Sequence, residues 1–320
     1  MKRLLILSGG GAKGAFQAGV IYNLVRSGKL KDDEIFAVAG TSVGSINGLW
    51  CASNAALTPR GMELMKDMWL SLKPRNVYKQ QPKWFAFLKA LILKRNYIFD
   101  FSPLEKHLHE KIVPLLKFNK IYINCSVNLQ TGKSSGIYVE EDKMFFGDSE
   151  VVSDREEMLV KSVLASCAIP VVFPPVKIGK YSYVDGGVRE VIPVGFAISN
   201  LRKHGHIKGG DEINVIIVSC SPLHTLKEEE KNFYENLYAI LARSYDILWQ
   251  EHLENDVRQI SLYNLIYKNN NDIKSEIVKL NVEMYTPVKK LGDATDFTPT
   301  TLQKYFEMGE RGNFINYRTT

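Results

Sequence analysis

Short apolar runs that end in glycine mark the first fifty residues of the chain. Leu4–Leu7 is fully apolar and leads into a glycine-rich loop, and Ile35–Ala39 leads into a second glycine-bounded turn. Short apolar runs bounded by turn residues are typical of strands that are buried on both faces. Between them, apolar residues recur at helical spacing from Phe16 to Leu24. The pattern predicts a strand–helix–strand unit with parallel strands and a right-handed crossover.

The pattern also predicts elements along the rest of the chain. It predicts a helix over 155–165 and strands at 121–128, 135–139, 181–184, 215–218 and 276–284. Strands that alternate with helices indicate the α/β class. The sequence contains neither an internal repeat nor a clear linker. We therefore expect a single domain over residues 1–320, with the core motifs in 1–222 and a C-terminal strand and helices in 223–320.

A serine lies between the second predicted strand and a run suited to a helix. Gly40-Thr41-Ser42-Val43-Gly44 has the G-x-S-x-G spacing of a nucleophile elbow, a sharp turn that projects a serine hydroxyl. The two glycines permit the turn, and the positive end of the following helix lies near the hydroxyl. On its own this spacing fits an ordinary turn equally well. Its place between a strand and a helix favours a nucleophilic Ser42.

A second glycine-rich run follows the first strand and opens the first helix. In Gly9-Gly10-Gly11-Ala12-Lys13-Gly14, several backbone N–H groups can point at one anion. The run also satisfies the G-x-G-x-x-G pattern of dinucleotide-binding proteins, which is the main alternative. That alternative requires an acidic residue at the end of the second strand, whereas Asp32–Glu34 precede this strand. We therefore favour an oxyanion hole formed by backbone amides of this run.

A nucleophilic serine needs a base, and Asp185 is the candidate. In Asp185-Gly186-Gly187 it ends a short predicted strand, where a carboxylate is able to reach across the ends of parallel strands. Taken alone, the run is explained better by an ordinary Asp-Gly turn. The order in which the three runs occur changes this interpretation.

The three runs together resemble those of the patatin-like phospholipase family. Ala165–Pro170 and Phe173–Pro175 resemble the family's segment before its catalytic Asp, Asn128–Gly132 its strand turn, and Thr286–Gly312 its C-terminal ending. The resemblance implies a three-layer α/β/α sandwich with a central, mostly parallel sheet. It also implies a Ser–Asp dyad, with Ser42 as nucleophile and Asp185 as base, that hydrolyses lipid esters.

Carried over residue by residue, the resemblance gives a set of site residues. Gly9–Gly11 form the oxyanion loop, and the residues that support the motifs are Lys13, Gly14, Gly40, Gly44, Gly186 and Gly187. Two positions depart from the family's pattern: Lys13 replaces the usual Arg and loses its planar fork, and Val191 lies near the position of a common Asn.

The function implied is that of a serine lipid acyl hydrolase of the phospholipase A or lysophospholipase type, which cleaves carboxylic esters. A phospholipid or another fatty-acyl ester is then the substrate. The alternative from another class is a nucleotide- or phospholipid-binding regulatory module with a degenerate active site. We expect neither a metal nor an organic cofactor, because a serine, a carboxylate and backbone amides suffice for ester hydrolysis.

Composition adds little to this interpretation. The chain has 320 residues, 45% of them hydrophobic, as expected for a globular protein with a sizeable core. Its net charge of +6 favours anionic surfaces such as phospholipid headgroups, and we expect no nucleic-acid partner. The four cysteines lie far apart, without metal-ligand spacing.

The sequence predicts neither a signal peptide nor a membrane span. The first apolar run is too short for a signal peptide, and no stretch approaches the ~20 residues of a membrane span. We expect a cytoplasmic protein whose contact with membranes, if any, is peripheral.

Two features leave alternatives open. His204, His206, His224 and His252 follow Asp185, as a Ser–Asp–His order requires, and His224 is best placed because it follows an apolar strand. The resemblance implies a dyad, so we expect none of them to be catalytic. The segment Trp84–Arg95 mixes large apolar residues with basic ones. It fits a core helix about as well as a lid or a membrane contact.

Overall fold

A computed structural model describes residues 3–79, 97–223, 237–270 and 274–319. Within these residues, parallel strands in the spatial order β11, β10, β1, β2 and β3 form the centre of one sheet. Their bounds are Arg3–Leu7 for β1, Ile35–Thr41 for β2, Ile121–Asn128 for β3, Glu212–Val218 for β10 and Lys279–Pro287 for β11.

Antiparallel strands extend both edges of this parallel centre. β12 pairs with β11 at one edge, β5, β6 and β7 follow β3 at the other, and β9 branches from β3 together with β8 and β4. These strands are β4 (Ser134–Ser135), β5 (Ile137–Glu140), β6 (Lys143–Phe146), β7 (Ser149–Glu150), β8 (Val176–Ile178), β9 (Tyr181–Asp185) and β12 (Phe314–Thr319). The sheet is therefore mixed, with a mostly parallel centre, as the resemblance implied.

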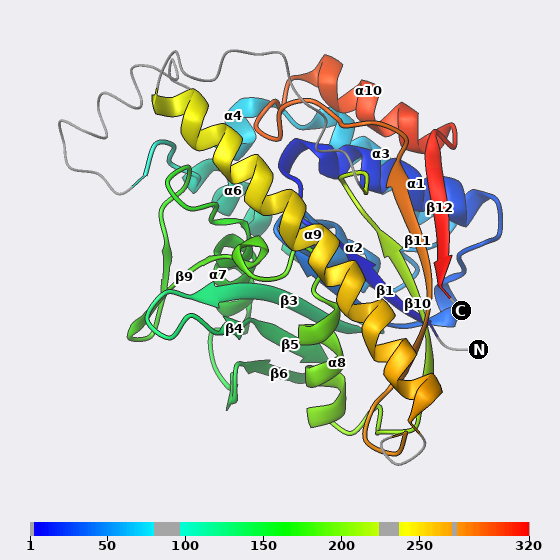
Figure 1. Cartoon of the computed structure of the whole chain (residues 1–320). Coiled ribbons are helices and arrows are strands. Elements are labelled where there is room, and N and C mark those ends of the chain that lie inside the picture. Colours follow the sequence, from blue (N-terminus) through cyan, green and yellow to red (C-terminus); the bar gives the residue numbers. More distant parts are fainter. Residues whose placement is uncertain (1–2, 80–96, 224–236, 271–273, 320) are drawn as a thin grey trace.

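Strand β1 shows how the sheet separates two layers of helices. Leu5 and Leu7 belong to one buried cluster and Leu4 and Ile6 to another, because successive side chains of a strand point to opposite faces. Helices on both faces explain why the central strands are continuous apolar runs. The expected three-layer α/β/α sandwich is confirmed (Figure 1).

The helices divide between the two faces according to these clusters. The first cluster includes side chains of α1 (Gly14–Arg26), α2 (Val43–Cys51), α3 (Pro59–Ser71), α4 (Pro74–Val77), α6 (Ser102–His107), α7 (Arg155–Cys167) and α10 (Pro299–Glu310). The second includes side chains of α8 (Val194–Lys203) and α9 (Leu237–Asn269). Helix α9, which the apolar pattern did not predict, runs diagonally across the sheet in Figure 1.

The parallel strands bring the predicted motifs to one edge of the sheet. The glycine-rich loop follows the carboxyl end of β1, and Ser42 follows that of the neighbouring β2. Antiparallel pairing with β3 places Asp185 opposite Ser126, close to the same edge. Ligands of open α/β sheets bind outside the carboxyl ends of the strands, so this edge is the place to look for a site.

None of the helices within the described ranges is both long and apolar enough to cross a membrane.

Candidate active site

Ser42 lies in a tight turn between β2 and α2. Its backbone adopts φ 55° and ψ −127°, a conformation that residues other than glycine rarely take and that is typical of functional sites. The flanking glycines are required by close packing. A Cβ at Gly40 would lie 2.1 Å from the Gly44 carbonyl oxygen, and a Cβ at Gly44 would lie 2.3 Å from that of Leu7. The sharp turn that the sequence predicts is therefore present.

Hydrogen bonds from two helices hold this turn. The Ser42 amide donates to Ser166 Oγ at 2.9 Å, and Ser166 Oγ donates to the Cys125 carbonyl oxygen at 2.6 Å. The Ser42 carbonyl oxygen accepts from the amide and the hydroxyl of Ser45, at 2.8 Å and 2.6 Å. No motif marks Ser45 or Ser166 in the sequence, because a serine inside a helix carries no motif signal.

Asp185 is fully buried at the end of β9, next to Ser42. Its Oδ1 accepts the Gly187 amide at 2.8 Å, whereas Oδ2 has no hydrogen bond of ordinary geometry to any described residue. Burial raises the pKa of this carboxyl to about 7, and the Ser42 hydroxyl and the Gly187 amide act in the opposite direction. The Ser42 hydroxyl therefore lies near enough to Asp185 to act on the pKa of its carboxyl.

The glycine-rich loop after β1 lies beside Ser42, since a Cβ at Gly9 would lie 3.2 Å from the Ser42 Cβ. Among the hydrogen bonds of the described residues, none engages the amides of Gly10 and Gly11. The Gly9 amide, also predicted as an oxyanion donor, already donates to the Val191 carbonyl oxygen at 3.1 Å. Gly11 has φ 58°, and a Cβ there would lie 2.2 Å from the Ala294 carbonyl oxygen, so a side chain would be strained as well as crowded.

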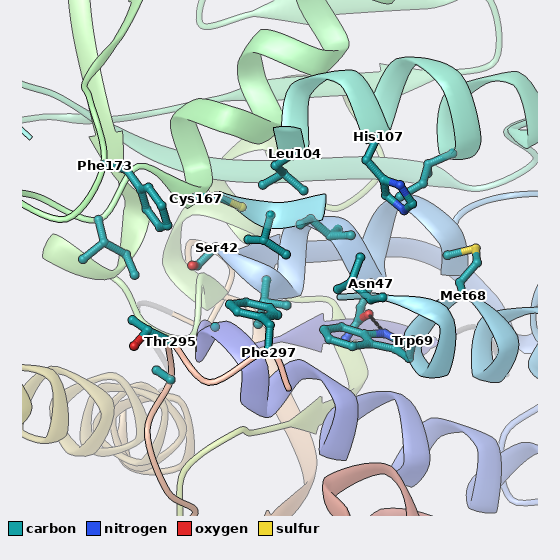
Figure 2. A pocket seen from close by; sticks show the side chains of 18 of the residues that line it. Ser42, Asn47, Met68, Trp69, Leu104, His107, Cys167, Phe173, Thr295 and Phe297 are labelled. Atoms are coloured by element: carbon teal, nitrogen blue, oxygen red, sulfur yellow. Dashed lines mark hydrogen bonds between the residues drawn. The ribbon is translucent and has the colours of Figure 1, made fainter. Parts of the chain in front are cut away.

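An apolar pocket of about 80 Å³ lies beside Ser42. Figure 2 shows Ser42 at one end of it and His107 and Met68 at the other. Asn47 lines the pocket too, but its Oδ1 accepts the Trp69 indole N–H at 2.9 Å, so this polar group is already paired. The remaining wall is mostly apolar, which suits a hydrocarbon chain better than a sugar or a nucleotide.

A match to a known protein family identifies the family of this chain. The model of the patatin-like phospholipase family matches residues 5–198, more than half of the chain. The chain belongs to the patatin-like phospholipase family. This membership supports lipid hydrolysis as the class of activity.

Individual relatives share less than a third of their residues with this chain. A cGAMP-activated phospholipase of Vibrio cholerae is 27% identical over 202 residues, which cover 58% of this chain and 54% of that protein. The chain therefore matches about half of that relative's length. A probable lipid hydrolase, 463L, of invertebrate iridescent virus 6 is 22% identical over 293 residues, 87% of this chain and 91% of that protein. The crystal structure of VipD from Legionella pneumophila has 12% identity and a TM-score of 0.36, covering 99% of this chain and 68% of that one.

The two departures from the patatin-like pattern have different surroundings. Lys13 is half-buried, and burial lowers the pKa of its ammonium, against an opposing effect of the nearby Asp246. Val191 is fully buried and apolar, so its side chain makes no hydrogen bond. Its backbone, however, carries the carbonyl oxygen that holds Gly9.

Helix α9, which lies outside the family match, also contacts the patatin-like site. A Cβ at Gly187 would lie 2.1 Å from the indole ring of Trp249, and one at Gly9 would lie 2.6 Å from the same ring. Trp249 therefore packs against both the glycine-rich loop and the turn that follows Asp185. No motif in the sequence indicated Trp249, because the two loops that its indole ring contacts are far from it in the sequence.

Two of the histidines that follow Asp185 have partners other than Ser42. His204 stacks on Tyr138 with ring centroids 3.9 Å apart, and His206 pairs with Glu140 at 3.0 Å. Of the pocket residues, His107 was not weighed in the sequence; Figure 2 shows it across the pocket from Ser42. His224 lies outside the described residues, as does the segment Trp84–Arg95. Among the residues that are described, no cluster of His, Cys, Asp or Glu suits a metal ion.

Proposed function

We propose that this chain hydrolyses carboxylic esters of lipids, with Ser42 as the nucleophile and Asp185 as the general base. One observation carries the proposal: a serine in a strained elbow lies beside a buried carboxylate that keeps one oxygen unpaired. An ordinary Asp-Gly turn would leave the carboxylate in water, and an ordinary serine turn would not need the strained backbone. Membership of the patatin-like family adds the expectation of a lipid substrate.

Acylation begins when an ester carbonyl enters the space between Ser42 and the glycine-rich loop. Asp185 takes the hydroxyl proton as Ser42 Oγ attacks the carbonyl carbon, which forms a tetrahedral intermediate. The intermediate then collapses: the bond between the carbonyl carbon and the alcohol oxygen breaks, and the departing alcohol takes the proton from Asp185. The products are a free alcohol or lysolipid and an acyl-Ser42 ester.

Deacylation repeats these steps with water. Asp185, again a carboxylate, accepts a proton from water while the water oxygen attacks the acyl carbon. The second intermediate breaks its bond to Ser42 Oγ, and Oγ recovers the proton from Asp185. The fatty acid leaves, and the residues return to their starting state without any cofactor. A pKa of about 7 suits Asp185 to both accepting and returning a proton near neutrality.

The negative oxygen of both intermediates needs donors, and we assign this role to the amides of Gly10 and Gly11. Both lie in the loop that faces Ser42, and neither has a partner among the described hydrogen bonds. The Gly9 amide is already bonded to Val191, so it supports the loop instead. Loss of one such donor typically slows catalysis about 10²–10³-fold.

The apolar pocket beside Ser42 gives the acyl chain its place. With the carbonyl carbon at Ser42, the chain extends along the pocket toward Met68 and His107, and the alcohol half of the ester faces outward. Transfer of each methylene from water to such a surface contributes about 0.8 kcal/mol. The substrate class is therefore a fatty-acyl ester, and phospholipids are the members that the family favours.

The test is turnover and labelling by the full chain. We expect it to hydrolyse a short-chain nitrophenyl ester and phospholipid vesicles, and a fluorophosphonate to label Ser42. Ser42→Ala should abolish labelling and hydrolysis, whereas Ser53→Ala, a buried serine at the far end of α2, should change neither. Undiminished labelling of Ser42→Ala would overturn the assignment of Ser42 as the nucleophile, and an inactive, unlabelled wild type would support the binding-module alternative.

A further inference from the structure

Three consecutive residues after the Asp185 turn connect both catalytic loops. The Glu190 carbonyl oxygen accepts the hydroxyl of Thr41, the residue before Ser42, at 3.0 Å. The Val191 carbonyl oxygen accepts the Gly9 amide at 3.1 Å. The segment 190–192 therefore sets the place of the nucleophile's strand and of the glycine-rich loop at once.

Asp256 of helix α9 binds this segment by hydrogen bonds to its backbone. The Ile192 amide donates to Asp256 Oδ2 at 2.8 Å, and the Val191 amide also interacts with the carboxylate. Asp256 is only 8% exposed. The Val191 and Ile192 side chains are apolar and buried, so Asp256 satisfies backbone groups that their own side chains cannot.

We propose that Asp256 is a positioning residue for the reaction at Ser42: it fixes the segment 190–192, and through it the oxyanion loop and the elbow. The inference rests on the proposed function. It concerns a part of the chain beyond the family match, which ends at residue 198. Asp256 touches neither the substrate pocket nor Ser42, so it acts only through the backbone that it holds.

The free-energy cost of burying Asp256 indicates that this residue does more than attach α9 to the sheet. Burying a carboxylate is costly, and burial raises the pKa of Asp256 to about 8, with Glu190 adding to the rise. Attachment alone is better served by apolar side chains such as Leu253 and Ile260, which pack from the same buried face of α9. Costly buried groups of this kind are expected where function, not stability, is at stake.

The experiment compares Asp256→Asn and Asp256→Ala with Ile260→Ala in the full chain. Ile260→Ala removes packing one turn further along α9 without removing a hydrogen bond to 190–192, so it reports on the packing of the helix. We measure kcat and KM on a soluble nitrophenyl ester, the melting temperature, and hydrogen exchange of the Gly9 amide. A displacement of about 1 Å in a catalytic group can cost roughly 10²-fold in rate.

We expect Asp256→Asn to lower kcat about tenfold and Asp256→Ala about 100-fold, with KM within about twofold of wild type. Exchange at Gly9 should accelerate in both. Ile260→Ala should lower the melting temperature while kcat stays within about twofold, since cavity formation affects stability chiefly.

Two outcomes would overturn the proposal. In one, kcat and Gly9 exchange are unchanged in Asp256→Asn. In the other, Ile260→Ala lowers kcat as much as the Asp256 variants do at an equal loss of melting temperature. If Asp256→Ala does not fold, Asp256→Asn decides, because it keeps the size of the side chain. An inactive, unlabelled wild type would instead be a failure of the proposed function, and Gly9 exchange would still report whether Asp256 holds the loop.

Discussion

The amide of Ser42 donates to the hydroxyl of Ser166, 124 residues further along the chain, at 2.9 Å. The same hydroxyl donates to the Cys125 carbonyl oxygen, so α7 fixes the elbow to β3. A helix that contributes no reacting group thus holds the backbone of the elbow in place.

We expect Ser166→Ala to lower kcat at least tenfold, because the strained turn loses its support. Unpairing two buried backbone groups should also cost about 1–3 kcal/mol of stability. Ser162→Ala is the matched control: Ser162 lies one turn earlier on α7, is equally buried and donates to Asn124 Oδ1 at 2.8 Å. It should lose similar stability and keep its kcat. Denaturant unfolding and steady-state kinetics measure both quantities, and equal kcat in the two variants would contradict the prediction.

The pKa of Asp185 predicts how the rate depends on pH. A general base acts only when it is deprotonated, and burial places this pKa at about 7. We expect kcat/KM for a soluble ester to rise about tenfold per pH unit below pH 7 and to level off above it. A profile measured between pH 5 and pH 9 with an uncharged substrate tests this. Activity that stays constant down to pH 5 would show that another group, or an unshifted carboxyl, is the base.

The same shift predicts a cost in stability. The folded pKa of Asp185, about 7, lies above the ordinary value of 3.8, so the folded state binds the proton more tightly than the unfolded state. The stability contributed is complete below pH 4 and is lost as the pH rises to 7. Asp185→Asn cannot ionise, so it should be inactive yet more stable than wild type at pH 8, by on the order of a few kcal/mol at most. Its advantage should shrink toward pH 4. Urea unfolding at both pH values checks this, and a variant less stable than wild type at pH 8 would refute it.

The central strands and the elbow could be predicted from sequence because their signals are local. Leu4–Leu7 and Ile35–Ala39 are apolar on both faces of the sheet, and Gly40 and Gly44 are required by contacts within a few ångströms of Ser42. The strand ending at Asp185 also had its own apolar pattern. Local patterning of this kind is enough to locate these strands, whereas the central, mostly parallel sheet was an expectation of the family resemblance.

The bounds of helix α9 could not be predicted from the apolar pattern, and the reason lies in the surface of the helix. Its buried face carries Trp249, Leu253, Asp256 and Ile260, which include a charged residue, while apolar residues such as Leu248 and Leu262 are exposed. The hydrophobic periodicity is therefore blurred along the whole helix. The residues that α9 contributes to the site depend on long-range contacts, for which the sequence holds no local signal.

The pocket geometry predicts a dependence on acyl-chain length. Met68 lies at the end of the pocket away from Ser42 (Figure 2). Met68→Trp should shorten the pocket, so the rate on long-chain nitrophenyl esters should fall at least tenfold. The rate on the acetate or butyrate ester should stay within about twofold of wild type, because short chains do not reach this position. Met308→Trp, on α10 away from the pocket, is the control and should alter neither. A uniform loss over all chain lengths would mean that the acyl chain takes another path.

No histidine should be essential for the chemistry. His204 and His206 are engaged with Tyr138 and Glu140, and the group that interacts with the Ser42 hydroxyl is the carboxylate of Asp185. We expect His224→Ala to keep kcat on a short ester within a few-fold of wild type, whereas Asp185→Ala should lose at least 10³-fold, as removal of a catalytic base does. His107→Ala provides a second comparison, because this side chain lines the pocket opposite Ser42: it should alter KM for long-chain esters and leave fluorophosphonate labelling of Ser42 unchanged. A histidine variant that folds, yet loses labelling and turnover as completely as Asp185→Ala, would establish a triad in place of the dyad.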